Sequence, residues 1–181
     1  MLLVDSRAAL EASVSALSGA PTLYLDTEFE SNRDGTRLCL LQVSRGDEIY
    51  LVDSVRLTGL EPLTPVLGNP ETLWVLHAGQ QDVPLLAERL ALGSAPRVFD
   101  TQVAWAMLGP EYSVSLAYLI YRVLGIRTGK SHQADDWIRR PLPAAQLAYA
   151  AGDIEHLPAI HAELARRCAE LWTQIKTEDG S

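Results

Sequence analysis

The stretch from Leu23 to Glu30 constrains the fold most, because it places two carboxylates inside a run that otherwise has the pattern of a buried strand. Side chains alternate in direction along a strand, so Asp26 and Glu28 should point to one face and Thr27 to the other. At about 3.3 Å per residue, the two acidic Cα atoms lie roughly 6.6 Å apart. Two like charges at this spacing repel unless a cation lies between them. The pair therefore predicts a site for a hard divalent cation, which prefers oxygen ligands.

Composition limits the classes to which the chain can belong. Its 181 residues, 48% hydrophobic and 21% charged, predict a single domain over residues 1–181 with a substantial core. No apolar run approaches the roughly 18 residues that span a membrane, and residues 1–5 lack the pattern of a signal peptide. We therefore expect no membrane association and a cytoplasmic location, with Cys39 and Cys168 as reduced thiols.

The net charge of −8 argues against a broad basic surface for duplex nucleic acid. It does not exclude a phosphate substrate that is bridged by metal ions, because bound divalent cations offset the carboxylates that hold them. Composition alone thus leaves a metal-dependent enzyme of nucleic acids open.

Hydrophobic periodicity predicts an α/β domain. Strands are expected over residues 23–30, 38–44, 48–52, 73–77 and 97–100. Helices are expected over residues 6–18, 59–67, 82–92, 101–107, 115–124 and 144–175, and Pro158 should kink the last of them. The continuously apolar strand at 73–77 indicates a sheet that is covered on both faces.

A second acidic constellation lies in the last expected helix. Tyr149 and Asp153 are four residues apart and so share one helix face, and small residues around them let that face approach another element. The alternative is an exposed tyrosine beside a solvated acid on a surface helix. Asp82, between a strand and a helix, would add a fourth carboxylate to Asp26, Glu28 and Asp153.

In this order the motifs resemble those of the DEDDy group of 3′–5′ exonucleases, and within it the exonuclease domain of ribonuclease D. The three motifs are Asp26-Thr27-Glu28-Phe29, the segment from His77 to Asp82, and the segment from Tyr149 to Asp153. Supporting fragments are Leu41-Gln42, Phe99-Asp100-Thr101-Gln102, Lys130-Ser131 and the segment from Asp136 to Leu142. The resemblance implies a ribonuclease H-like fold with a mixed five-stranded sheet flanked by helices. Ribonuclease D carries additional HRDC domains, and we expect none in this chain.

The resemblance also implies the chemistry of the site. Two divalent ions, Mg²⁺ or Mn²⁺, would be held by four carboxylates, those of Asp26, Glu28, Asp82 and Asp153. The Tyr149 hydroxyl, with an ordinary pKa near 10, is suited to orient the attacking water by hydrogen bonding rather than to act as a base.

Contacts to the substrate are expected from residues around these motifs. Thr27 and Phe29 should hold the terminal nucleotide, and Arg139 with Lys130 and Arg140 forms a local basic patch that either contacts phosphate or is solvated. His77 is a further candidate contact, although its apolar strand favours a hydrogen-bonded core histidine. Asp100 should cap the next helix rather than bind metal.

The resulting hypothesis is a metal-dependent 3′–5′ exoribonuclease that acts on single-stranded RNA ends. An exodeoxyribonuclease is the near alternative, because nothing in the sequence identifies a contact to the 2′-hydroxyl. A catalytically inactive nucleic-acid-binding domain is the third possibility. The presence of all four acids and the tyrosine argues against it.

Overall fold

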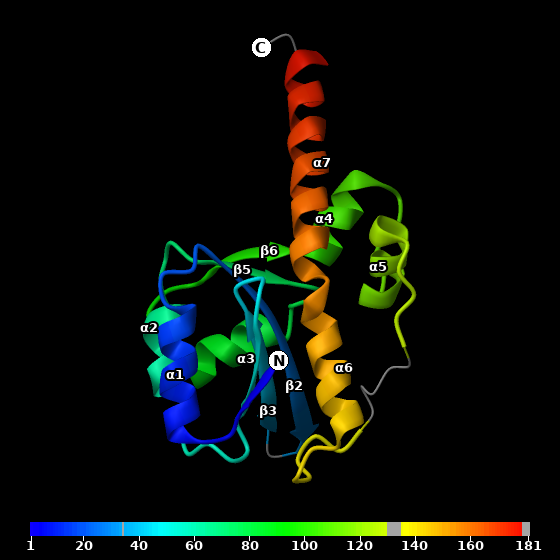
Figure 1. The fold of residues 1–181 in the computed structure, drawn as a ribbon. Helices are drawn as coiled ribbons and strands as arrows, with labels where there is room; N and C mark the ends of the chain where they lie inside the picture. Colours follow the sequence, from blue (N-terminus) through cyan, green and yellow to red (C-terminus); the bar gives the residue numbers. More distant parts are fainter. Residues whose placement is uncertain (34, 130–134, 179–181) are drawn as a thin grey trace.

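A six-stranded mixed sheet forms the centre of the molecule, in the order β1-β4-β3-β2-β5-β6 (Figure 1). The computed structural model describes residues 1–33, 35–129 and 135–178. Strands β2, β3 and β4 form an antiparallel meander, whereas β1 pairs parallel to β4, and β5 and β6 continue parallel from β2. The strands are β1 (Leu2–Val4), β2 (Thr22–Asn32), β3 (Gly35–Ser44), β4 (Ile49–Asp53), β5 (Leu73–Leu76) and β6 (Arg97–Asp100).

The five expected strands are all present. The prediction of a five-stranded sheet is wrong because the sheet has a sixth strand, the short edge strand β1. This strand has only three residues, of which Leu2 and Leu3 are exposed. So short a segment shows no alternation in the sequence, and its pairing with β4 is a tertiary contact.

Helices cover both faces of the sheet and form three apolar clusters. On one face α1, α2 and α3 pack over the strands, and on the other face Ala150 of α6 packs over Leu40 and Leu51. A third cluster joins α4 and α5 to α7. The helices are α1 (Arg7–Leu17), the 3₁₀ turn η1 (Glu61–Leu63), α2 (Thr64–Leu67), α3 (Asp82–Arg89), α4 (Thr101–Leu108), α5 (Leu116–Leu124), α6 (Ala144–Glu155) and α7 (Leu157–Glu178).

The expected long helix over residues 144–175 is two helices, α6 and α7, separated at His156. Pro158 has no N–H to continue the hydrogen-bond ladder, and it is tolerated in the first turn of a new helix. The break lets α6 cross the sheet beside β2 while α7 packs on α4 and α5 and then projects beyond the body (Figure 1).

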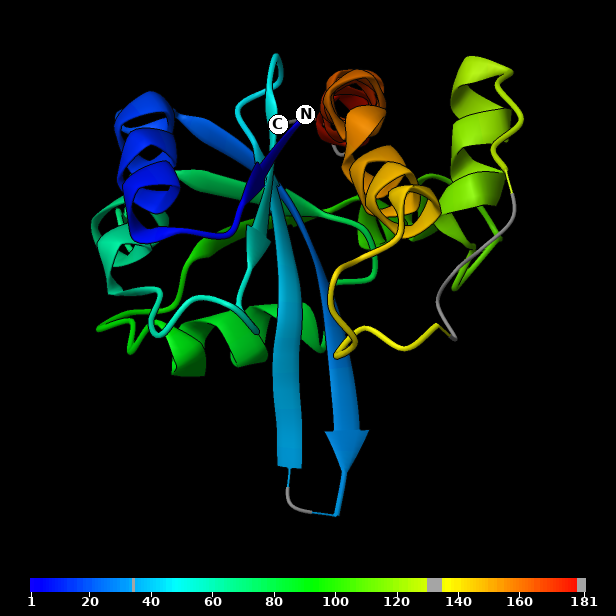
Figure 2. The same ribbon diagram turned by 60° about the horizontal axis from the view of Figure 1, so that its bottom comes forward.

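Strand β2 is the element that positions the site. β5 pairs with it only from Thr22 to Tyr24, so in the described part of the chain the following stretch of β2 has no strand along that edge. On its other edge β2 pairs with β3 in a long hairpin that extends beyond the helices, as Figure 2 shows. A bulge shifts the register at Cys39, so Cys39 and Leu40 both face the α6 side.

Cys39 is buried and Cys168 is half-buried, and both are free thiols. Among residues 1–33, 35–129 and 135–178, no helix is both long enough and apolar enough to cross a bilayer.

Candidate active site

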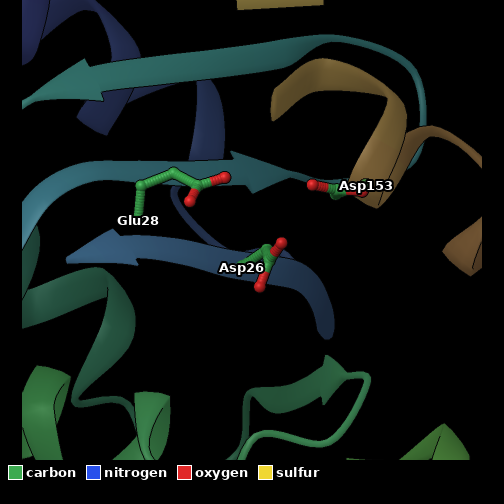
Figure 3. Close-up of side chains that lie close together, drawn as sticks. All are labelled: Asp26, Glu28 and Asp153. Carbon is green, nitrogen blue, oxygen red and sulfur yellow. The ribbon is translucent and has the colours of Figure 1, made fainter. Parts of the chain in front are cut away.

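Three carboxylates from two elements converge on the α6 side of the sheet. Asp26 and Glu28 come from β2 and Asp153 from α6, and one oxygen of each lies within 4.8 Å of the others. Figure 3 shows the three carboxylate groups gathered around a common space. This confirms that Asp26 and Glu28 point to the same face, as alternation along the strand predicts.

Burial raises the pKa of all three carboxyl groups, and the neighbouring negative charges add to the rise at Asp26 and Glu28. Burial, with the charges of Asp153, Asp82 and Glu28, raises the pKa of Asp26 well above its usual range. Burial and the charges of Asp153 and Asp82 raise the pKa of Glu28 to about 8, and burial raises the pKa of Asp153 to about 6. An all-oxygen donor set that is short of positive charge fits a divalent cation.

The raised pKa of Glu28 leads to a prediction for the metal-free protein. The ordinary pKa is 4.5 and the folded value is about 8, so the unfolded chain releases this proton first as the pH rises. The free energy of unfolding should therefore fall between these pH values. In EDTA at pH 8 we expect Glu28→Gln to melt about 2–4 °C higher than the unsubstituted chain, or more.

The same comparison at pH 4 supplies the control, because Glu28 is then protonated in the folded state and mostly protonated in the unfolded state, so the difference should largely disappear. Thermal unfolding followed by circular dichroism at the two pH values measures both. If Glu28→Gln melted at a lower temperature than the unsubstituted chain at pH 8, the ionised Glu28 carboxylate would not destabilise the folded protein.

Asp82 begins α3 and lies outside the group of three carboxylates. Its Oδ1 accepts a hydrogen bond from the Thr27 hydroxyl, which points to the opposite side of β2 from Asp26 and Glu28. The charge of Asp82 nevertheless raises the pKa of both Asp26 and Glu28. Asp82 is therefore a neighbour of the cluster, and Thr27 ties it to β2. The sequence proposed Thr27 as a substrate contact and gave no sign of this bond.

Tyr149 lies one turn before Asp153 on α6, and its hydrogen bond to Asp153 opposes the rise in the pKa of that carboxyl. The tyrosine ring lies 6.3 Å from the ring of Trp137, centroid to centroid. Trp137 is buried, and its backbone N–H donates to Glu30 of β2 at 3.3 Å. Both Tyr149 and Asp153 are half-buried. This excludes the alternative of an exposed tyrosine beside a solvated acid.

Arg140 anchors the segment that leads into α6. Its guanidinium contacts both oxygens of buried Asp53, with Nε to Oδ2 at 2.6 Å and Nη2 to Oδ1 at 2.7 Å. It also donates to the backbone carbonyls of Cys39, at the bulge, and of Trp137. The sequence grouped Arg140 with a surface basic patch, but these contacts make it an internal anchor. Of that patch, Arg139 is exposed, and Lys130 lies outside the described residues.

The loop from His77 to Gln81, which precedes Asp82, is held by two polar side chains. Asp100 caps α4, as expected, and also accepts from the N–H groups of Ala78 at 3.0 Å and Gly79 at 2.9 Å. Ala78 has a left-handed φ of 55°, which is costly for a residue with a Cβ. Both ring nitrogens of His77 form hydrogen bonds of 2.9 Å, Nδ1 with the Thr101 hydroxyl and Nε2 with the Val114 carbonyl oxygen. This geometry favours the interpretation of His77 as a hydrogen-bonded core histidine.

Comparison with known proteins agrees with this geometry. Residues 1–169 match the protein family described as 3′-5′ exonuclease. Ribonuclease D of Nitrobacter hamburgensis is 36% identical over 186 residues, which cover 98% of this chain and 48% of that protein. The chain spans about half the length of the curated relatives it matches.

Two solved structures illustrate the similarity of fold. RNase D of Escherichia coli, described as an exoribonuclease involved in structured RNA processing, aligns with a TM-score of 0.83 and 31% identity, over 92% of this chain and 44% of that one. NrnC of Brucella melitensis aligns with a TM-score of 0.74 and 27% identity, over 84% and 75% of the two chains. NrnC has also been solved bound to pGG.

Proposed function

The chain belongs to the 3′-5′ exonuclease family, and on that premise we propose that it is a metal-dependent exoribonuclease that removes nucleotides from the 3′-hydroxyl end of single-stranded RNA. One observation carries the proposal. Asp26, Glu28 and Asp153 bring their carboxylates within 4.8 Å of one another, in a buried site beside Asp82 and Tyr149. Such a group is unfavourable without a cation.

Asp26, Glu28, Asp82 and Asp153 would hold two divalent ions, which we propose to be Mg²⁺ or Mn²⁺ because every donor is an oxygen. When bound, such ions supply a hydroxide nucleophile at neutral pH and stabilise the charge that develops on the leaving 3′ oxygen. The protein's own contribution is to hold the four carboxylates in place. Strand β2 fixes Asp26 and Glu28, Thr27 holds Asp82, and Tyr149 holds Asp153.

Tyr149 has a separate role in this proposal. Its hydroxyl forms a hydrogen bond to Asp153, and a phenolic oxygen can in addition accept a hydrogen bond from a water molecule. An ordinary tyrosine has a pKa near 10, so the hydroxyl orients water without removing its proton.

Tyr149→Phe should therefore lower turnover by on the order of 10²-fold, the range of a positioned group that handles protons. Mn²⁺ should still bind, because the tyrosine is not a ligand, but more weakly, because its hydroxyl holds Asp153. Turnover of labelled RNA and titration with Mn²⁺ measure the two effects. Tyr118→Phe is the matched control, since its hydroxyl donates to Glu111 on another part of the chain. If Tyr149→Phe and Tyr118→Phe turned over RNA at the same rate, the hydroxyl of Tyr149 would have no role in catalysis.

Substrate contacts remain part of the proposal. Phe29 is half-buried and Arg139 is exposed, so both have surface available for a base and a phosphate. Stacking on an aromatic ring accepts any base, and we expect little sequence preference. The names of the ribonuclease D relatives and the pGG complex of NrnC support RNA as the substrate class. We also place the protein in the cytoplasm, which two free cysteines support.

A panel of substrates tests the function. Single-stranded RNA and DNA oligomers of several lengths are incubated with Mg²⁺, with Mn²⁺ and with EDTA. We expect shortening of RNA with either metal, slower attack on DNA and none in EDTA. Faster attack on DNA would identify an exodeoxyribonuclease, and no hydrolysis under any condition would identify an inactive binding domain.

A further inference from the structure

Gln42 is a completely buried polar side chain at the edge of the carboxylate cluster. It lies on β3 directly opposite Asp26 and has 0% exposure. Its amide nitrogen donates to Oε1 of Glu28 at 3.4 Å, and its own Oε1 has no partner within the part of the chain that the structure describes. A buried acceptor without a partner costs about 1–3 kcal/mol.

Packing alone gives no reason for an amide at this position. On the side of β3 away from Asp26, the residue opposite Gln42 is buried Leu51 of β4, and Leu40 packs in the same cluster as Leu51. An apolar side chain of similar volume would fill this space without a lost hydrogen bond. Rules of local stability are most often broken at functional sites.

Glu28 needs a partner more than its neighbours do. It has three rotatable bonds, and the charges of Asp153 and Asp82 push its carboxylate away. Asp153 and Asp82 each have a hydroxyl donor, from Tyr149 and Thr27 respectively. Among the described residues, the donor to the Glu28 carboxylate is Gln42.

We infer that Gln42 is a positioning residue for the metal centre, and that it holds the Glu28 carboxylate in the orientation that faces Asp26 and Asp153. This inference rests on the proposed function. Partners that orient metal ligands in this way typically change metal affinity by about 10–100-fold when they are removed.

Titration of metal-free protein with Mn²⁺ tests the inference on Gln42→Met and, as a second variant, Gln42→Leu. Both substitutions remove the amide group and put an apolar side chain of similar size in its place. We expect the Kd for Mn²⁺ to rise by about 10–100-fold, while the melting temperature in EDTA stays equal or rises. Saturating Mn²⁺ should restore turnover, because the ligands themselves are intact.

Gln146→Met is the matched control. Gln146 is likewise buried, and its amide donates at the same 3.4 Å, but to the backbone carbonyl of Asp136. Its substitution should leave the Kd for Mn²⁺ unchanged.

An unchanged Kd in folded Gln42→Met and Gln42→Leu would overturn the inference. A large loss of stability in both variants would overturn it as well, because Gln42 would then serve folding. If the unsubstituted chain binds no Mn²⁺, the metal centre of the proposed function fails and the inference fails with it.

Discussion

Replacing Asp26 or Asp153 with asparagine is expected to lower turnover of a 5′-labelled RNA oligomer by at least about 10³-fold, because each change removes an anionic ligand worth several kcal/mol to the transition state. Both residues belong to the group whose carboxylates lie within 4.8 Å. The variants should stay folded, since removing one charge relieves repulsion in the cluster. Melting curves in EDTA should therefore show no loss of stability.

Asp47→Asn is the control, because Asp47 is exposed and its carboxylate accepts only from the N–H of Glu48 among the described hydrogen bonds. Its turnover should match that of the unsubstituted chain. If Asp26→Asn or Asp153→Asn retained full turnover after trace metal had been removed and Mg²⁺ added back, the carboxylates would be wrongly assigned.

Arg140→Met is expected to lower the free energy of unfolding by about 3–5 kcal/mol, because it removes the guanidinium that neutralises the buried carboxylate of Asp53 and leaves the backbone N–H donors of Val55 and Arg56. The side chains of the pair are only 12% and 2% exposed, so water cannot replace the guanidinium. The melting temperature should fall by on the order of 10 °C, as measured by differential scanning calorimetry.

Two further variants show whether the charge is the cause. Arg7→Met breaks the exposed pair with Glu11, whose side chains are 62% and 60% exposed, and should change the melting temperature little. Asp53→Asn combined with Arg140→Met should recover part of the loss, since no buried charge remains. Equal effects of Arg140→Met and Arg7→Met would show that the Asp53 contact does not stabilise the fold.

Much of the fold follows from local patterns. The buried strand with Asp26 and Glu28 and the apolar strand β5 were predicted because alternation and apolar runs act within a few residues. Pro158 was predicted to kink one long helix, whereas the chain forms two helices that are separated at His156. The bulge at Cys39 and the pairing of β1 with β4 were not predicted. Both are set by contacts between strands, and neither leaves a periodic signal.

The acidic residues of the candidate site could be predicted from the sequence, but most of the residues that hold them in place could not. Spacing placed Asp26 with Glu28 and Tyr149 with Asp153 on common faces, because strand and helix periods are fixed. The bond from Thr27 to Asp82 and the contact of Arg140 with Asp53 join residues that are far apart in the chain. The family resemblance placed Gln42 in a supporting sequence fragment but predicted no role for it. Its contact with Glu28 depends on the register between β2 and β3, which the sequence does not show.

The most direct test of the proposed site follows the products of one RNA sequence that is presented with three kinds of end. A 5′-labelled oligomer with a 3′-hydroxyl should give a ladder that shortens one nucleotide at a time, and only with Mg²⁺ or Mn²⁺ present. The same oligomer with a 3′-phosphate should be attacked much more slowly, because the added negative charge approaches the carboxylate of Glu28, which repels it. A circular form should remain intact. Products from the circle, or equal rates on the two linear ends, would contradict a 3′-end exonuclease site built on Asp26, Glu28 and Asp153.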